Sequence, residues 1–226
     1  MSTQEQVSKQ LLSRLTHHVR NPFNGIIGFT DLLQNHFHKL NDDDKLNYLQ
    51  IVHQLSKKAL LRSENLSWWL KFYTNNVTPV QQSFDLTVVI QEELNYFTNE
   101  TQKQHLDIEM EIGSGVMVNT DKMMVQNILK NVIMNIIEFS PVGENVDIIL
   151  TKTTKQAILT FTNVYKDSPS DETLVYIEDL NTGTDVLRMP ENPGIWTINN
   201  LCKQLNIDFN ISLNNNAAKV VLTFNI

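Results

Sequence analysis

Apolar side chains near the N-terminus recur with alternating spacings of three and four residues. The series is Leu12, Leu15, Val19, Pro22, Ile26, Phe29 and Leu33. This spacing is typical of a helical bundle, in which one stripe of each helix packs against its neighbours. It predicts a long helix over residues 4–40. At 100° per residue, His17 lies nearly opposite the stripe, so its imidazole is expected to face solvent. Asn21 lies one turn further along the same face.

A second helix is predicted after the polar run at residues 41–44, and it is expected to end near Phe72. An aspartate of that run is expected to be its N-cap. Its apolar positions are Tyr48, Val52, Leu55, Ala59, Leu66 and Trp69. Two long helices joined by a short turn form an antiparallel hairpin that leaves apolar surface uncovered. We therefore expect a homodimer with a four-helix bundle. The alternative is a hairpin that folds back onto the rest of its own chain.

The net charge of −7 argues against a nucleic-acid partner, because binding to phosphates needs a concentrated positive surface. The sequence has no apolar stretch long enough to span a bilayer and no secretion signal at its start, so we expect a cytoplasmic protein without membrane insertion. Cys202 is the only cysteine, which excludes an intramolecular disulfide and a cysteine metal cluster. It lies in a helical apolar pattern and is expected to be buried.

The remainder of the chain predicts a two-layer α/β sandwich, which makes the whole an α+β protein. The polar segment 74–79, which ends at a proline, is predicted to be a linker, and the predicted domains are 1–78 and 79–226. Helices are expected from Phe84 to Gln104, over residues 121–139 and from Asn192 as N-cap, and strands over 106–112, 146–150, 157–161 and 220–224. The segment 167–192 is rich in Ser, Asp, Thr and Pro and is expected to be a loop.

Three asparagines stand one above another on the predicted helix 121–139. They are Asn127, Asn131 and Asn135, at positions i, i+4 and i+8. Asparagine is a poor residue for a helix interior because its amide competes for backbone hydrogen bonds. One explanation is a solvated polar face. The other is a site where the amide oxygens reach a metal ion that is held by phosphates.

The segment from Thr16 to Phe29 closely resembles the phosphoacceptor box of sensor histidine kinases, His-acidic-x-Arg-Asn/Thr-Pro. The resemblance implies that His17 is the phosphoacceptor and Arg20 the arginine of the box. It also implies that Asn21 helps to position water for dephosphorylation. His18 stands where the family has its acidic general base for autophosphorylation. An imidazole can accept a proton, but it has no carboxylate to orient the neighbouring ring.

A second resemblance covers Asp121 and residues 131–143, which are similar to the N-box of the same family. It implies that Asn131 and Asn135 belong to a nucleotide site and that Asn135 binds Mg²⁺ on ATP. Two residues depart from the family. Ile136 replaces a small residue, and Glu138 replaces a lysine that faces the phosphates. A carboxylate at that position would repel a triphosphate.

The glycine motifs of the family are largely absent. Asn163 stands for the aspartate of Asp-x-Gly-x-Gly, and Tyr165 stands for its first glycine. Gly194 remains from the second glycine box, after a proline that lacks the amide needed for an anion. Trp196 replaces a small residue. We therefore expect no cofactor, with Asn163 and Gly194 as residues of a former nucleotide site; Mg-ATP would be the cofactor of an active kinase.

Three functions follow from these resemblances. The first is a phosphorelay protein whose His17 accepts a phosphoryl group and donates it to the aspartate of a response-regulator receiver. The second is an ATP-dependent histidine kinase that phosphorylates its own His17. The third is a non-catalytic pseudokinase scaffold. In the first case the expected partners are a second copy of the chain, a receiver domain and an upstream kinase or sensor.

Overall fold

The computed structural model describes residues 3–166, 170–181, 193–214 and 216–226, with side chains from residue 20 onward except that of residue 172. The chain divides into two compact units, Met1–Thr74 and Asn75–Ile226. The predicted domain boundary after residue 78 stays a prediction.

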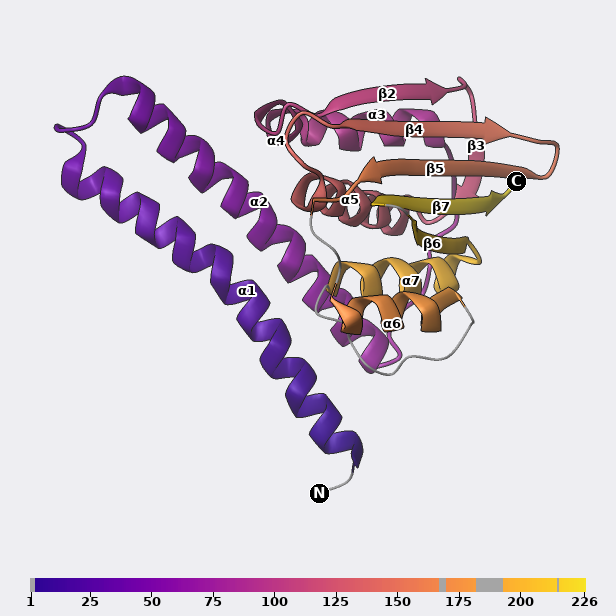
Figure 1. Ribbon diagram of the computed structural model, residues 1–226. Coiled ribbons are helices and arrows are strands. Elements are labelled where there is room, and N and C mark those ends of the chain that lie inside the picture. The colour runs from indigo at the N-terminus through magenta and orange to yellow at the C-terminus, as the bar shows by residue number, and fades with distance from the viewer. Residues whose placement is uncertain (1–2, 167–169, 182–192, 215) are drawn as a thin grey trace. The chain divides into compact units, whose positions relative to one another are not determined.

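The first unit is an antiparallel helical hairpin made of α1 (Thr3–His36) and α2 (Asp42–Tyr73), as Figure 1 shows. Both helices were predicted within a few residues of these bounds. In the described part of α1, Pro22 is buried and lies inside an unbroken helix. The rings of Phe29 and Tyr48 meet across the hairpin with centroids 5.5 Å apart. The alternating apolar stripe therefore forms the seam between the helices.

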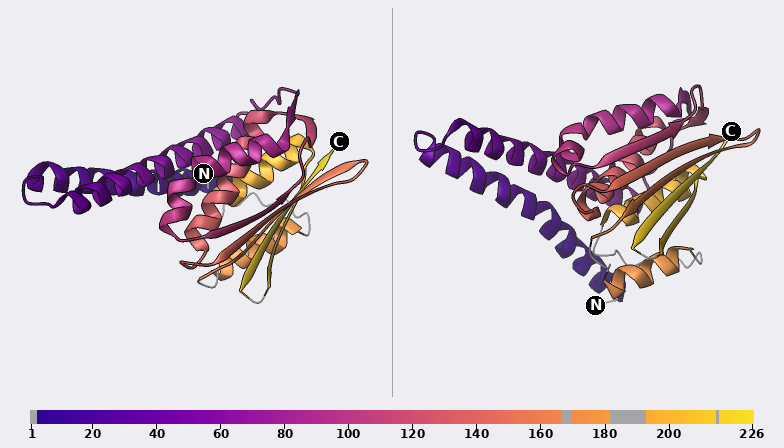
Figure 2. Two further views of the ribbon diagram at one scale, coloured as in Figure 1. Left: turned by 90° about the horizontal axis from the view of Figure 1, so that it is seen from above. Right: turned by 45° about the horizontal axis from the view of Figure 1, so that its top comes forward.

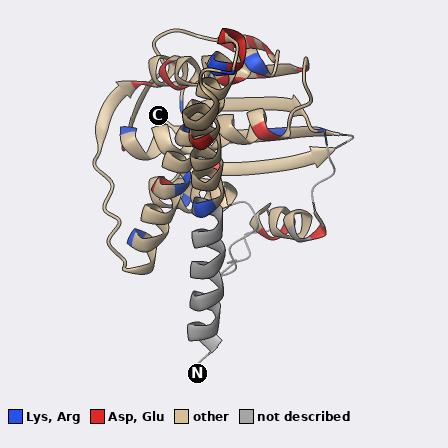
Figure 3. Cartoon of the chain, turned by 90° about the vertical axis from the view of Figure 1, so that its left-hand side faces the viewer, with Lys and Arg blue, Asp and Glu red and all other residues tan. Residues whose placement is uncertain are grey.

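The cap of α2 differs from the prediction, because it is Asn41 and not an aspartate. Its side-chain oxygen accepts a hydrogen bond of 2.7 Å from the backbone nitrogen of Asp44. The three aspartates 42–44 lie in the first turn, where the helix dipole favours negative charge. Figure 3 shows acidic residues in red at this end of the hairpin. Lys45 donates a hydrogen bond of 2.9 Å to Asp42, which lowers the pKa of that carboxyl.

The second unit contains a five-stranded sheet in the order β2-β4-β5-β7-β6. The strands are β2 (Asp107–Ile112), β4 (Asn145–Lys152), β5 (Gln156–Val164), β6 (Asp208–Asn214) and β7 (Ala217–Asn225). β2 runs parallel to β4, and the other pairs are antiparallel. Three helices, α3 (Leu86–Tyr96), α5 (Lys122–Phe139) and α7 (Pro193–Leu205), cover one face (Figure 2). The predicted two-layer sandwich is confirmed.

The core lies between this face and the three helices. All six residues of the apolar stripe predicted for α5 are buried: Val125, Ile128, Leu129, Val132, Ile133 and Ile136. On the central strands β5 and β7, the side chains of Leu159, Phe161 and Leu222 are buried in this core. Cys202 of α7 is buried as expected, and burial raises the pKa of its thiol. In the part of the chain that the structure describes, no helix is both long and apolar enough to cross a membrane.

The helix predicted from Phe84 to Gln104 is wrong at its start and in its middle. Phe84 and Asp85 belong to β1 (Gln82–Asp85), which pairs with β3 (Met117–Thr120) in a separate two-stranded sheet. Asp85 then caps α3, because its side chain accepts from the backbone nitrogen of Thr87 at 2.9 Å. A second break falls at Phe97, whose ring is buried, and α4 (Thr98–Lys103) follows it.

The loop predicted over 167–192 contains a helix, α6 (Asp171–Asn181), and residues 167–169 and 182–192 lie outside the described residues. Ser170 stabilises the start of α6, because its hydroxyl oxygen accepts from the backbone nitrogen of Thr173 at 3.3 Å. The predicted N-cap Asn192 also lies outside the described residues. Strand β6 was missed because polar residues occupy most of its positions.

Two glycines of α1 allow a test of the seam. A Cβ atom added to Gly28 has no neighbour within 4 Å, whereas one added to Gly25 meets Cδ1 of Leu55 at 2.7 Å. Glycine costs a helix about 1 kcal/mol relative to alanine. We expect Gly28→Ala to raise the free energy of unfolding by about that amount, and Gly25→Ala to gain clearly less because Leu55 must move. Chemical denaturation of both variants measures this; an equal gain would contradict the close approach of the helices at Gly25.

Candidate functional site

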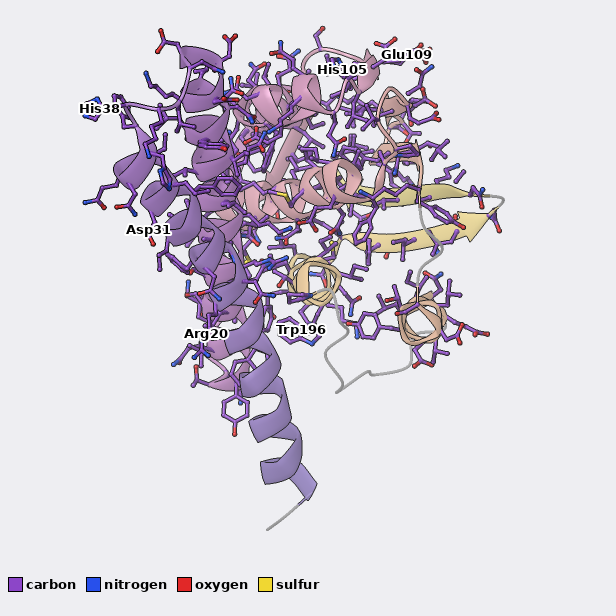
Figure 4. The ribbon with its side chains drawn as sticks, turned by 60° about the vertical axis from the view of Figure 1, so that its left-hand side comes forward. Arg20, Asp31, His38, His105, Glu109 and Trp196 are labelled. Atoms are coloured by element: carbon purple, nitrogen blue, oxygen red, sulfur yellow. The ribbon has the colours of Figure 1, made fainter. Side chains whose placement is uncertain are left out.

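The phosphoacceptor box lies on α1, but the side chains of His17 and His18 are outside the described residues. The predicted outward orientation of His17 therefore stays a prediction. The next two residues of the box are described, and both Arg20 and Asn21 are exposed. Arg20 projects from α1 in Figure 4. Pro22 follows on the buried side of the helix, so the described end of the box has one outward face and one face in the seam.

Large apolar side chains remain exposed on both helices of the hairpin. On α1 they are Phe23, Ile27 and Leu32, Phe37 follows directly after the helix, and on α2 they include Leu46, Leu49 and Leu60. About half of the surface of each is exposed; Ile27, for example, is 56% exposed. Single exposed apolar residues are common, but several of them on two paired helices indicate a surface that takes part in further packing.

The asparagines of α5 are not a solvated polar face. Asn127 and Asn131 are 5% and 3% exposed. The side-chain nitrogen of Asn131 donates to the backbone oxygen of Asn127 at 2.9 Å and to its side-chain oxygen at 3.1 Å. Asn135, one turn further, is half-buried. Asn131 therefore donates to Asn127 inside the protein, a role that burial explains and that the sequence pattern did not indicate.

Asn163 lies near the end of β5 and is 7% exposed. Its side-chain nitrogen donates to the hydroxyl of Ser140 at 3.0 Å and to the backbone oxygen of Val164 at 3.0 Å. Ser140 is the C-cap of α5 and is 1% exposed. The position where the family has a carboxylate that accepts a hydrogen bond thus carries an amide that donates two. The bond to Ser140 ties β5 to the end of α5.

The backbone after Asn163 is also held in place. The backbone nitrogen of Tyr165 donates to the backbone oxygen of Asn216 at 2.9 Å, and that of Lys166 donates to the backbone oxygen of Phe139 at 2.8 Å. The segment that replaces the first glycine motif is therefore attached to α5 on one side and to the β6–β7 turn on the other. Two backbone donors that a glycine-rich loop would offer to a ligand are used within the protein.

The start of α7 contains the remnant of the second glycine box. Pro193 and Gly194 are buried, and the hydroxyl of Thr197 donates to the backbone oxygen of Pro193 at 3.0 Å. Because proline has no N–H, the first position of this helix offers no donor to an anion. Trp196, labelled in Figure 4, is 9% exposed and belongs to the same turn.

The predicted nucleotide residues thus lie on neighbouring elements. Asn131 and Asn135 are on α5, which packs against α7, and Gly194 lies in the first turn of α7. Asn163 reaches the end of α5 through Ser140. Sequence reasoning missed Ser140, although its position just before Pro141 marks a helix end. In the described part of the chain, no group of three or more His, Cys, Asp or Glu side chains could hold a metal ion, and Mg²⁺ at Asn135 stays a prediction.

The role of the Asn163 side chain as a hydrogen-bond donor can be tested by replacing it with aspartate, the residue that the family has at this position. In Asn163→Asp, a carboxylate would face the backbone oxygen of Val164 and could no longer donate to Ser140. We expect the free energy of unfolding to fall by about 1–3 kcal/mol, because buried hydrogen bonds are lost and polar groups are left without a partner. Denaturation by urea measures it. Asn225→Asp, on an exposed residue, is the control. A fully stable Asn163→Asp variant would show that the donated bonds do not matter.

Comparison with known proteins identifies the first unit. The family model of the His Kinase A (phospho-acceptor) domain matches residues 8–66. Among curated relatives, the autoinducer 2 sensor kinase/phosphatase LuxQ of Vibrio harveyi is 23% identical over 142 residues, which are 61% of this chain. The signal transduction histidine-protein kinase BarA of Escherichia coli is 24% identical over 148 residues, or 65% of this chain. Each match spans only 16% of the relative's length.

Solved structures share the fold of the whole chain. The histidine kinase AdeS of Acinetobacter baumannii is similar with a TM-score of 0.63 and 16% identity, over 92% of this chain and 97% of that one. The histidine kinase ThkA, solved in complex with the response regulator TrrA, gives a TM-score of 0.59 at 15% identity, over 98% and 63% of the two chains. A bacterial phosphotransferase gives 0.53 at 13% identity, over 98% and 97%.

The matched residues 8–66 include the whole phosphoacceptor box, and the sandwich that follows has the fold of histidine kinase catalytic domains. Residues 8–66 are therefore a His Kinase A (phospho-acceptor) domain, and the chain as a whole has the fold of histidine kinases.

Proposed function

We propose that this chain transfers a phosphoryl group between His17 and the aspartate of a response-regulator receiver. The observation that carries the proposal is the match of residues 8–66 to the phospho-acceptor family. This range contains His17 together with Arg20 and Asn21, which the structure leaves exposed on α1. A receiver needs access only to this part of the hairpin, because it brings its own aspartate.

In the transfer step, a neutral ring nitrogen of His17 attacks the phosphorus of the receiver's aspartyl phosphate. The N–P bond forms while the P–O bond to the aspartate breaks, and the electrons of that bond return to the carboxylate. The proton on the other ring nitrogen is then able to pass to solvent. Arg20, at i+3 from His17, adds a positive charge near the phosphoryl oxygens. The reverse reaction donates the group to a receiver.

We further propose that the second unit does not hold Mg-ATP. Three observations support this. Asn163 donates to Ser140 and Val164 where the family's aspartate would accept from a ligand. The backbone at Tyr165 is bonded to Asn216. The first turn of α7 begins with a buried proline. The phosphoryl group would then come from an upstream kinase or sensor.

The exposed apolar residues of the hairpin support two partners. A second copy of the chain would cover part of this surface and complete a four-helix bundle. A receiver domain is the other partner, which is supported by the complex of ThkA with its response regulator TrrA. Lys and Arg are interspersed with Asp and Glu on the side shown in Figure 3, which does not favour a nucleic-acid partner.

Autokinase activity is the second candidate function. It is favoured by the register of Asn131 and Asn135 on α5, which matches the family's N-box, and by relatives that are named as sensor kinases. A pseudokinase scaffold would need neither His17 nor a nucleotide. The following experiments separate the three functions.

Replacing His17 by Gln should abolish phosphoryl acceptance from a phosphorylated receiver, because the amide has no nucleophilic ring nitrogen. Transfer to the chain is measured by phosphate-affinity electrophoresis over a panel of receivers. His38→Gln, on an exposed residue beyond α1, is the matched control and should retain transfer. Phosphorylation of the His17→Gln variant would refute the assignment of His17.

Calorimetric titration with Mg-ATP should show no binding in the micromolar range. The backbone donor at Tyr165 is bonded within the protein, and the glycines of the Asp-x-Gly-x-Gly motif that would approach the phosphates are absent from the sequence. A histidine kinase with an intact nucleotide site is the positive control. Micromolar binding, together with labelling of His17 by ATP alone, would favour the autokinase instead.

A further inference from the structure

The last residue of α6, Asn181, binds the edge of the sheet. Its side-chain nitrogen donates to the backbone oxygen of Ile211 at 2.7 Å, and its side-chain oxygen accepts from the backbone nitrogen of Ile211 at 3.4 Å. The side-chain nitrogen of Asn210 also donates to this oxygen, at 3.2 Å. α6 packs against β6, which is the last strand in the order of the sheet.

These bonds occupy a position where a further strand would pair. Residues of an antiparallel strand alternate between bonding to their neighbour and pointing to the open side. Ile211 lies opposite Val220 of β7, but both of its backbone polar groups turn outward to Asn181. The amide of Asn181 therefore replaces one residue of a neighbouring strand.

The two edges of the sheet differ in how they resist pairing. Edge strands are usually protected by charge, by proline or by a covering element. The edge strand β2 carries Asp107, Glu109 and Glu111, so two such edges would repel each other. Glu109 is labelled in Figure 4. In contrast, β6 has the sequence DFNISLN, with neither lysine nor proline and a single charge. Its protection depends on α6.

Packing of α6 supports this role. Tyr176 and Ile177 are 1% and 7% exposed, and burial raises the pKa of the Tyr176 phenol. These side chains anchor α6 by apolar contact, whereas Asn181 makes the directional contact to β6. We propose that Asn181 is a latch that closes the β6 edge, and that its release lets β6 pair with the β6 strand of a second copy. This proposal is independent of phosphotransfer.

Hydrogen exchange at single amides tests the latch in the full chain. In Asn181→Leu, the amide of Ile211 should exchange about tenfold faster, because the side-chain oxygen that accepts from it is removed. The loss of one hydrogen bond of about 1.4 kcal/mol corresponds to this factor. The backbone amide of Ser212 is the internal control. Alternate residues of an edge strand bond to the neighbouring strand, so the amide next to Ile211 is expected to bond to β7 and not to Asn181. Asn225→Leu is the control variant. Unchanged exchange at Ile211 would contradict the proposed role of Asn181. Equal acceleration at Ser212 would also contradict it, because the whole strand would then have become less stable.

The open edge is tested by sedimentation over a range of concentrations. Asn181→Leu should form assemblies larger than those of the unaltered chain. Adding Asn210→Lys, on an exposed residue of β6, should suppress them because lysines on two paired edges repel each other. An Asn181→Leu variant that assembles like the unaltered chain, or whose assemblies persist with Asn210→Lys, would overturn pairing through β6.

Discussion

The seam between α1 and α2 is the constraint on which the phosphoacceptor site depends. A stripe of apolar residues fixes the rotation of α1. Among its described residues, Pro22 is buried and Phe29 contacts Tyr48 of α2. Once the rotation is set, Arg20 and Asn21 are held on the outer face of a long rigid helix. Under the proposed function, a site on such a helix would need no cleft, because the receiver would arrive as a folded domain.

The second unit has the fold of histidine kinase catalytic domains, and several of its buried polar groups bond to other groups of the protein. Asn131 bonds to Asn127 within α5, and Asn163 bonds to Ser140 at the end of the same helix. A buried amide must have partners, since an unsatisfied one costs about 1–3 kcal/mol. Residues that resemble a ligand site in sequence therefore have a structural role that explains their burial. The same residue type closes the β6 edge through Asn181.

The sequence predicted those features that depend on periodicity. The hairpin, the apolar stripe of α5 and the strands around Ile148, Leu159 and Leu222 follow from regular burial of one face. It failed where local pairing decided the outcome. Phe84 joined a two-stranded sheet because residues 117–120 lie beside it, and α6 formed in a segment whose composition suggests a loop. The donor role of Asn163 needed the position of Ser140, 23 residues away.

The central claim is that phosphate reaches His17 from another protein and not from ATP. The most direct measurement is a ³¹P NMR spectrum of the full chain, recorded once with a phosphorylated receiver and once with Mg-ATP alone. The account predicts a phosphohistidine signal in the first sample and only nucleotide signals in the second. A phosphohistidine signal with Mg-ATP alone, or none with any receiver of a broad panel, would contradict it.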